Sequence, residues 1–219
     1  MYSFDEIAIF GYGGRNVPNE YLHLKKESDK LAMIFPGRGY TTQAPLLYYT
    51  ARTLLDKGYN VLNINYNYLH NSDFSNASKE DQIKWIRTDT SAAYESTKKI
   101  DADVEIIVGK SLGTIALSHL LKNYPETRQM KTIWHTPLIL SEDIQDAIRF
   151  HSSRPLLVIG KKDPHYEVSV LEDLLGSTDG VAKVIEDANH GMEVPGGPQA
   201  LLEVMIEIVK AMTTYIESD

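Results

Sequence analysis

The chain has 219 residues, of which 42% are hydrophobic and 24% are charged, as in an ordinary globular protein. It contains no cysteine, which excludes a disulfide framework, a thiolate metal site and a cysteine nucleophile. The net charge of −8 argues against a nucleic-acid partner, because phosphate backbones are bound by clustered lysines and arginines, and here the basic residues are scattered among more numerous acids. We therefore expect a small-molecule partner.

The start of the chain, MYSFDEIAIFGYGG, lacks the basic region and the long apolar core of a signal peptide. No apolar run approaches the length of a membrane span. We expect no membrane span and a cytoplasmic location. No feature of the sequence indicates the oligomeric state.

Short apolar runs alternate with amphipathic segments along the chain. Two early segments, 7–10 and 21–26, predict an antiparallel hairpin, and Leu22 and Leu24 alternate with polar neighbours in the second. Six further strands follow, and several are apolar on both faces, as expected in a parallel sheet that helices cover on both sides. These strands are LAMIF (31–35), YNVLNINY (59–66), EIIV (105–108), KTIW (131–134), PLLVI (155–159) and VAKVI (181–185).

Helices are predicted between the strands. Ser78 and Asp81 form a capping-box pattern that opens a helix carrying Ile83, Trp85 and Ile86. Apolar residues at helical spacing predict a largely buried helix after EIIV and a C-terminal helix that docks on the core. Their positions are 115, 117, 120 and 121 for the first and 201, 205, 208 and 212 for the second. The alternation predicts an α/β fold with a mostly parallel sheet, and because no repeat or linker divides the chain, we expect one domain over residues 1–219.

The stretch EIIVGKSLGTIAL, residues 105–117, contains two overlapping motifs. Gly109, Lys110 and Ser111 match the end of a phosphate-binding P-loop, but that loop needs a glycine five residues earlier, where this chain has Val104. The same residues with Gly113 spell GxSxG, a sharp turn between a strand and a helix that exposes a nucleophilic serine. The order strand, GKSLG, helix favours the serine reading, which leaves the side chain of Lys110 as an incidental neighbour.

A nucleophilic serine needs a base, and the base needs a carboxylate that orients it. Asp163 follows the PLLVI strand and His190 follows the VAKVI strand, in the order Ser, acid, His. Because the carboxyl ends of parallel strands share one edge of the sheet, all three should face one crevice. We expect His135 and His165 to approach the same crevice, and His165 is the alternative base.

With these motifs the chain resembles the α/β-hydrolases from about Leu31 to the C-terminal helix. GKSLG resembles the nucleophile turn, GKKD the acid loop and ANHG the histidine loop. The resemblance implies a three-layer fold and an oxyanion hole formed by the N–H of Leu112 and a second N–H from FPGRGY, supplied by Arg38 or Tyr40. It departs from the family at Pro36, where histidine is common, and at Thr114, where a third small glycine is common.

Aromatic residues that follow strand ends are candidates for a substrate pocket. They are Tyr40, Tyr66, Tyr68, Trp134 and Tyr166, each of which would otherwise cap the core. No metal-ligand spacing is present beyond a lone HxxE at His190, so we predict no metal and no organic cofactor.

The sequence thus predicts a serine hydrolase acting on an ester, thioester or related acyl bond of a small substrate. Only about twenty residues, 137–154, separate the sixth and seventh strands, and SEDIQDAIRF reads there as one helix, which leaves no room for a large lid domain. Two alternatives remain open. One is acyl transfer or other non-ester chemistry on the same fold, and the other is a binding protein without turnover.

Overall fold

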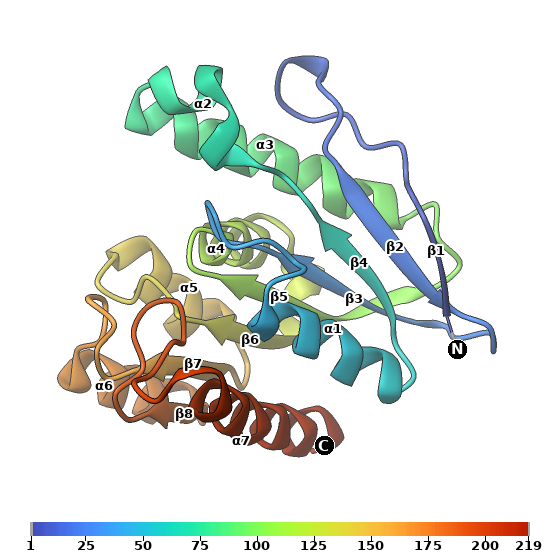
Figure 1. Cartoon of the computed structure of the whole chain (residues 1–219). Helices are drawn as coiled ribbons and strands as arrows, with labels where there is room; N and C mark the ends of the chain where they lie inside the picture. Colours follow the sequence, from blue (N-terminus) through green and yellow to red (C-terminus); the bar gives the residue numbers. More distant parts are fainter. Residues whose placement is uncertain (1, 219) are drawn as a thin grey trace.

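A single eight-stranded sheet forms the centre of the computed structural model, which describes residues 2–218 (Figure 1). The strand order is β1-β2-β4-β3-β5-β6-β7-β8, with β2 antiparallel to both neighbours and all other pairs parallel. The strands are β1 (Tyr2–Asp5), β2 (Asn19–Leu24), β3 (Lys30–Phe35), β4 (Asn60–Ile64), β5 (Asp103–Lys110), β6 (Lys131–His135), β7 (Leu156–Gly160) and β8 (Val181–Ile185).

Helices cover both faces of this sheet. The α-helices are α1 (Pro45–Asp56), α2 (Ser72–Asn76), α3 (Lys79–Thr97), α4 (Gly113–Asn123), α5 (Glu142–His151), α6 (Val168–Thr178) and α7 (Gly197–Glu217). Short 3-10 turns lie at Tyr12–Gly14, Tyr68–His70 and Pro125–Gln129. One face packs against α3, α4, α5 and α6, and the other against α1 and α7, which lie side by side (Figure 1). The predicted three-layer α/β architecture is confirmed.

The two layers follow from the alternation of side chains along buried strands. On β5, Ile107 joins the apolar cluster under α3 to α6, whereas Ile106 and Val108 join the cluster under α1 and α7. Both sets are fully buried, which explains why the sequence reads as apolar on both faces.

The predicted helix signals mostly agree with the structure. Ser78 caps α3 by accepting a hydrogen bond from the Asp81 N–H at 3.1 Å. Trp85 and Ile86 are buried on α3, but Ile83 is exposed on its outer face. Met205, Ile208 and Met212 bury one face of α7 as expected. Of residues 2–218, no helix combines the length and apolar character needed to cross a membrane.

The leading hairpin is present, but its first strand was predicted at the wrong place. The pair consists of Tyr2–Asp5 and Asn19–Leu24, with Tyr2 opposite Leu24. The apolar segment near Ile9 forms no strand, apart from a single bridge between Phe10 and Asn16. Ile9 is nevertheless 1% exposed, because it fills the core rather than the sheet edge. The second strand of the hairpin and its antiparallel pairing were thus predicted correctly, and the position of the first strand was not.

Candidate active site

The turn between β5 and α4 holds Ser111 in a left-handed backbone conformation, with φ of 53°. A non-glycine residue in this region costs about 1–3 kcal/mol and persists only where the surroundings enforce it. Here the Ser111 N–H donates to the His135 carbonyl at 2.9 Å, and its carbonyl accepts from the Thr114 N–H at 2.8 Å. Thr114 adds its hydroxyl to the same carbonyl at 2.6 Å, so the residue that departs from the family pattern reinforces the turn.

Two glycines make this turn possible because the backbones of neighbouring segments touch them. A Cβ on Gly109 would lie 2.6 Å from the Gly113 carbonyl oxygen, and a Cβ on Gly113 would lie 2.1 Å from the Phe35 carbonyl oxygen. Neither contact is possible for a real side chain. The spacing GxSxG therefore has a steric cause in this chain.

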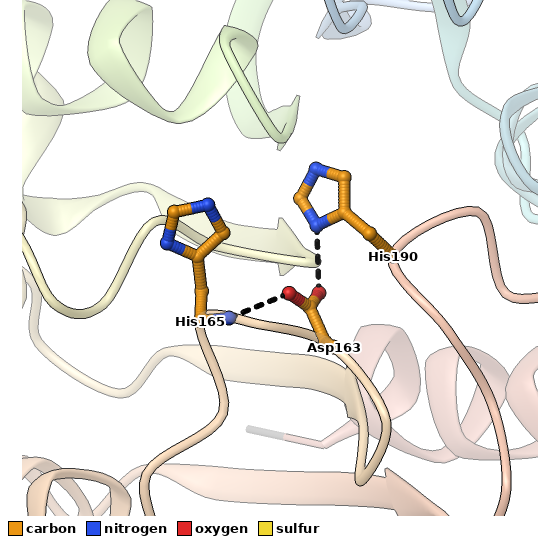
Figure 2. Close-up of side chains that lie close together, drawn as sticks. All are labelled: Asp163, His165 and His190. Carbon is orange, nitrogen blue, oxygen red and sulfur yellow. Dashed lines mark hydrogen bonds and ion pairs between the residues drawn. The ribbon is translucent and has the colours of Figure 1, made fainter.

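His190 lies between Ser111 and Asp163. Its Nε2 is 2.7 Å from the Ser111 Oγ, and its Nδ1 is 2.8 Å from the Asp163 Oδ2. Figure 2 shows the second of these bonds, with the His190 ring above the carboxylate. The predicted serine, acid and histidine, which are spread over 79 positions of the chain, are brought into one hydrogen-bonded line.

The carboxylate of Asp163 is fully buried at the end of β7. Burial raises the pKa of this carboxyl, but hydrogen bonds from His190 and from the main-chain N–H of His165 outweigh it, and the net pKa lies below its ordinary value. The second bond, 2.9 Å to Oδ1, occupies the oxygen that His190 leaves free (Figure 2). Asp163 is thus held as an ionised acceptor aimed at the imidazole.

The loop that carries His190 is folded upon itself. The Asn189 Oδ1 accepts hydrogen bonds from the N–H groups of Gly191 at 2.8 Å and Glu193 at 3.0 Å. Met192, which is fully buried, anchors the loop in the cluster under α1 and α7. Gly160 lets the Ala188 carbonyl approach β7, since a Cβ there would lie 2.1 Å from that oxygen. These contacts fix the fold of the loop and its place against β7.

The two other histidines have different places. His165 lies beside the site, with its ring centroid 5.5 Å from that of His190 and its Nδ1 buried without a partner within residues 2–218. Its main-chain N–H contacts the acid, while His190 is the histidine bonded to Ser111. His135 was expected to approach the crevice, but it does not reach it. It is fully buried at the end of β6, bonded to the Thr50 hydroxyl at 3.1 Å, and burial lowers the pKa of its imidazole to about 3.

The loop after β3 passes directly against the serine. A Cβ on Gly37 would lie 3.4 Å from the Ser111 Cβ, which leaves the following N–H groups near the reacting centre. The Tyr66 hydroxyl donates to the Pro36 carbonyl at 2.9 Å and holds this loop from below. Within residues 2–218 the N–H groups of Leu112, Arg38 and Tyr40 have no protein acceptor, so both alternatives for the second donor stay open. The Arg38 side chain extends toward α2, where its Nη2 is 3.4 Å from the Ser75 hydroxyl.

The aromatic pocket candidates divide into two groups. Tyr166 is half-buried just after Asp163, and Tyr40 is half-buried with its hydroxyl accepting from the Leu46 N–H at 2.9 Å. Trp134 is 0% exposed and bonds Thr132 inside the core, so its proposed pocket role is wrong. Tyr66 is also buried; its hydroxyl supports the loop after β3, and it borders a hollow with Tyr68 and Trp85 whose lining does not include Ser111. Side chains alternate between the two faces of the sheet along β6, and that of Trp134 packs into the cluster under α3 to α6. Its place near the end of the strand therefore does not bring it into a pocket.

Lys110 was read wrongly as an incidental neighbour. Its residue is 2% exposed, and its Nζ donates to the His190 main-chain carbonyl at 3.0 Å. Alternation along β5 places Lys110 on the same face as Ile106 and Val108, so the sequence did contain a signal for its burial.

Asp163, His165 and His190 also offer possible metal ligands within 4.8 Å of one another. Both ring nitrogens of His190 are already engaged, one by the serine and one by the acid. A metal bound there would have to break those hydrogen bonds. The arrangement is therefore better suited to moving a proton between Ser111 and His190, and the absence of a metal stays a prediction.

The strand order, the turn after β5 and the edge at which the three loops meet are those of the α/β-hydrolase fold. Three solved structures share this fold over nearly the whole chain. An esterase of Pyrococcus furiosus, Pf2001, matches with a TM-score of 0.72 and 14% identity, over 99% of this chain and 92% of its own. XC6422 of Xanthomonas campestris, a serine hydrolase of this fold without a lid, matches with a TM-score of 0.70 and 15% identity, over 98% of this chain and 94% of its own.

A dienelactone hydrolase of Anabaena variabilis matches with a TM-score of 0.69 and 19% identity, over 97% of this chain and 98% of its own. No protein-family model and no curated protein matches the sequence. The resemblance inferred from the motifs is therefore confirmed by the fold. The crossover between β6 and β7 carries one ten-residue helix, α5, and so agrees with the predicted lack of a large lid domain.

Proposed function

We propose that this protein is a serine hydrolase that cleaves an ester, thioester or related acyl bond of a small substrate. The observation that carries the proposal is the continuous line of hydrogen bonds from Ser111 through His190 to Asp163, at 2.7 and 2.8 Å. Such a line activates a hydroxyl that is otherwise a weak nucleophile near neutral pH. The three similar structures, an esterase, a lidless serine hydrolase and a dienelactone hydrolase, support hydrolysis as the reaction class.

In the first half of the reaction His190 removes the Ser111 proton while the oxygen attacks the substrate carbonyl carbon. The imidazolium that forms is stabilised and oriented by the ionised carboxylate of Asp163. The oxyanion is stabilised by the N–H group of Leu112 and that of Arg38 or Tyr40, and removing one such donor in comparable sites costs on the order of 10²–10³ in rate. His190 then protonates the leaving alcohol or thiol as its bond to the carbonyl carbon breaks.

In the second half water attacks the acyl-enzyme, with His190 as base. The carbonyl carbon gains the water oxygen, the bond to Ser111 breaks, and the serine regains its proton while the carboxylic acid leaves. No group outside the chain, other than water, is needed to balance this sequence. The backbone around Ser111 is already in the required conformation, so little reorganisation accompanies the chemistry.

Exposed apolar side chains on the loops around the same edge of the sheet favour a small apolar acyl group. Leu69 follows β4, Leu140 follows β6 and Val168 follows β7, and each is about half exposed. Leu69 packs on the loop after β3, where a Cβ on Gly39 would touch its side chain at 2.9 Å. Because these residues, Tyr40 and Tyr166 all follow strand ends at this edge of the sheet, we propose that they contact short or exposed acyl chains.

A fluorophosphonate probe tests the nucleophile directly. We expect stoichiometric labelling at Ser111, and loss of both labelling and hydrolysis of p-nitrophenyl esters in Ser111→Ala, by up to roughly 10⁶-fold if the three residues act as a unit. The matched control is Ser91→Ala, since Ser91 also contacts a histidine, His119, at 2.8 Å, but in a pair without a carboxylate. That variant should label and turn over like the wild type.

A series of esters with acyl chains of rising length, together with a thioester counterpart, measures the acyl preference. Folded protein that does not label at all would overturn the hydrolase proposal and favour a binding protein without turnover. Labelling accompanied by transfer to an added alcohol, in place of release to water, would favour acyl transfer.

A further inference from the structure

The ammonium group of Lys110 is buried beside the proposed active site. The residue ends β5, directly before Ser111, and its Nζ donates a 3.0 Å hydrogen bond to the main-chain carbonyl of His190. Within residues 2–218 it forms no ion pair with a carboxylate. A buried charge without an ionic partner is unfavourable for stability, so its presence next to the catalytic histidine calls for a functional reason.

The aliphatic part of the side chain explains how Lys110 reaches this position. Ile106 and Val108 precede it on the same face of β5 and lie in the apolar cluster under α1 and α7. The stem therefore continues an apolar row, and the ammonium emerges at the carboxyl end of the sheet. There it contacts the loop that follows β8 and carries His190.

The ammonium also contacts the loop after β3. Its Nζ lies 4.5 Å from the centroid of the Tyr40 ring, a distance at which the ring face attracts a cation. The Tyr40 hydroxyl is fixed by the Leu46 N–H, and a Cβ on Gly37 would lie 3.3 Å from the Lys110 Cδ. Lys110 thus connects the serine turn, the loop of the oxyanion hole and the histidine loop.

We propose that Lys110 is a positioning residue for His190: by holding its main-chain carbonyl, the ammonium keeps the imidazole Nε2 within hydrogen-bond distance of Ser111. This inference rests on the proposed hydrolase function. Besides Lys110, the histidine loop is held by its own turn, by Met192 and by the Lys162 N–H, which donates to the Ala188 carbonyl at 2.9 Å, and the imidazole is bonded to Asp163. Within residues 2–218, Lys110 is the residue that joins the main chain of this loop to the strand leading into Ser111. A shift of about 1 Å between nucleophile and base is enough to lower turnover by roughly 100-fold.

The charge state of Lys110 gives the proposal a signature that a purely structural role lacks. Burial lowers the pKa of the Lys110 ammonium to about 8, against a weaker opposing effect of the Asp163 carboxylate. A neutral amine donates a weaker hydrogen bond than an ammonium, so the contact to His190 weakens as the pH rises through that value.

Three of the other groups around Lys110 have pKa values that are moved away from pH 8. Burial raises the pKa of Tyr40 and lowers that of His135 to about 3, while the pKa of Asp163 lies below its ordinary value because hydrogen bonds from His190 and the His165 N–H outweigh its burial. His190 itself and Glu193, whose charge acts on Tyr40, complete the set that faces this region.

Three variants test the proposal: Lys110→Met, which keeps the length and removes the charge, Lys110→Arg, which keeps a permanent charge, and Lys162→Met as the matched control. Lys162 is exposed beside Asp163 and is changed in the same chemical way. We expect Lys110→Met to lower kcat for a p-nitrophenyl ester by 10- to 100-fold with KM changed less than threefold. Lys162→Met should match the wild type.

The pH profile separates positioning from general damage. Wild-type kcat should fall on the alkaline side with a midpoint near pH 8, this limb should vanish in Lys110→Met, and Lys110→Arg should recover at least part of the activity and keep it above pH 9. An unchanged kcat in folded Lys110→Met, or the same alkaline limb in that variant, would overturn the proposal.

A readout that does not depend on turnover distinguishes failure of this proposal from failure of the hydrolase function. The proton that His190 shares with Asp163 should give a downfield imidazole resonance, identified by its loss in Asp163→Asn. We expect it to exchange faster with solvent in Lys110→Met than in the wild type. If Ser111 does not react with the fluorophosphonate, the hydrolase function fails. If Ser111 reacts and neither kcat nor the resonance responds to Lys110→Met, only the role of Lys110 fails.

Discussion

Replacing Lys110 by methionine should make the protein more stable at neutral pH, although it is expected to lower activity. The pKa of the ammonium falls from 10.5 in the unfolded chain to about 8 in the folded protein because of burial. This difference of about 2.5 units, at roughly 1.4 kcal/mol per unit, makes the charged form about 3.4 kcal/mol less compatible with the fold than the neutral form. Methionine removes this penalty and loses a hydrogen bond of about 1 kcal/mol, so Lys110→Met should gain about 2 kcal/mol at pH 7.

The lowered pKa of Lys110 determines how the free energy of unfolding changes with pH. Between pH 8 and 10.5 the unfolded chain keeps the Lys110 proton longer than the folded protein does, so wild-type stability rises with pH in this window. Lys110→Met lacks this contribution, and its advantage should shrink by about 2.5 kcal/mol between pH 7 and pH 10. Titrating groups that do not interact with Lys110 cancel in the difference between the two proteins.

Urea unfolding of both proteins at half-unit steps from pH 7 to pH 10 measures that difference. The free energies of unfolding should converge and then cross near the upper end of the range. Parallel curves would refute the reasoning, because they would mean that Lys110 keeps its ordinary pKa in the folded protein. A wild type more stable than Lys110→Met at pH 7 would refute it as well.

Three further outcomes follow from the geometry. Asp163→Asn should lower kcat by about 10⁴-fold without unfolding, because the amide no longer holds the imidazole in the right tautomer; ester turnover and circular dichroism together check this. Gly113→Ala should lose fluorophosphonate labelling and lower Tm, since its Cβ would meet the Phe35 carbonyl oxygen at 2.1 Å, and an active variant would show that the turn can shift. Trp134→Ala should cost about 3–5 kcal/mol in urea unfolding, whereas Tyr166→Ala should mainly change KM for longer acyl chains; the reverse pattern would restore Trp134 to the pocket.

The six predicted parallel strands could be read from the sequence because each is a short apolar run and several are apolar on both faces. The turn at Ser111 was equally readable, since Gly109 and Gly113 stand where backbones touch. Asp163 and His190 followed from the rule that parallel strands end at a common edge. Each of these inferences used information local to one strand and its following loop.

Features that depend on distant packing were missed. Strand β1 has little apolar character and is defined by pairing with β2, while Ile9 resembles a strand residue but fills the core. Helix α1, which begins at Pro45, was not predicted, although Tyr40 caps it by accepting from the Leu46 N–H. His135 was placed in the crevice because it was expected in the loop after a strand, but its partner Thr50 belongs to α1, and no local pattern reports that contact.

The short crossover between β6 and β7 has a consequence for how this fold can be extended. Helix α5 bears the outward-facing Phe150, and the neighbouring Leu140 is likewise exposed, whereas the serine turn and the histidine loop are bound to their neighbours by glycine contacts and hydrogen bonds. An insertion in either of those two would displace a reacting atom. Leu140 is about half exposed and belongs to neither of them, so an insertion beside it should leave the serine turn and the histidine loop in place, and this crossover is a point at which a covering domain can be added or exchanged by engineering.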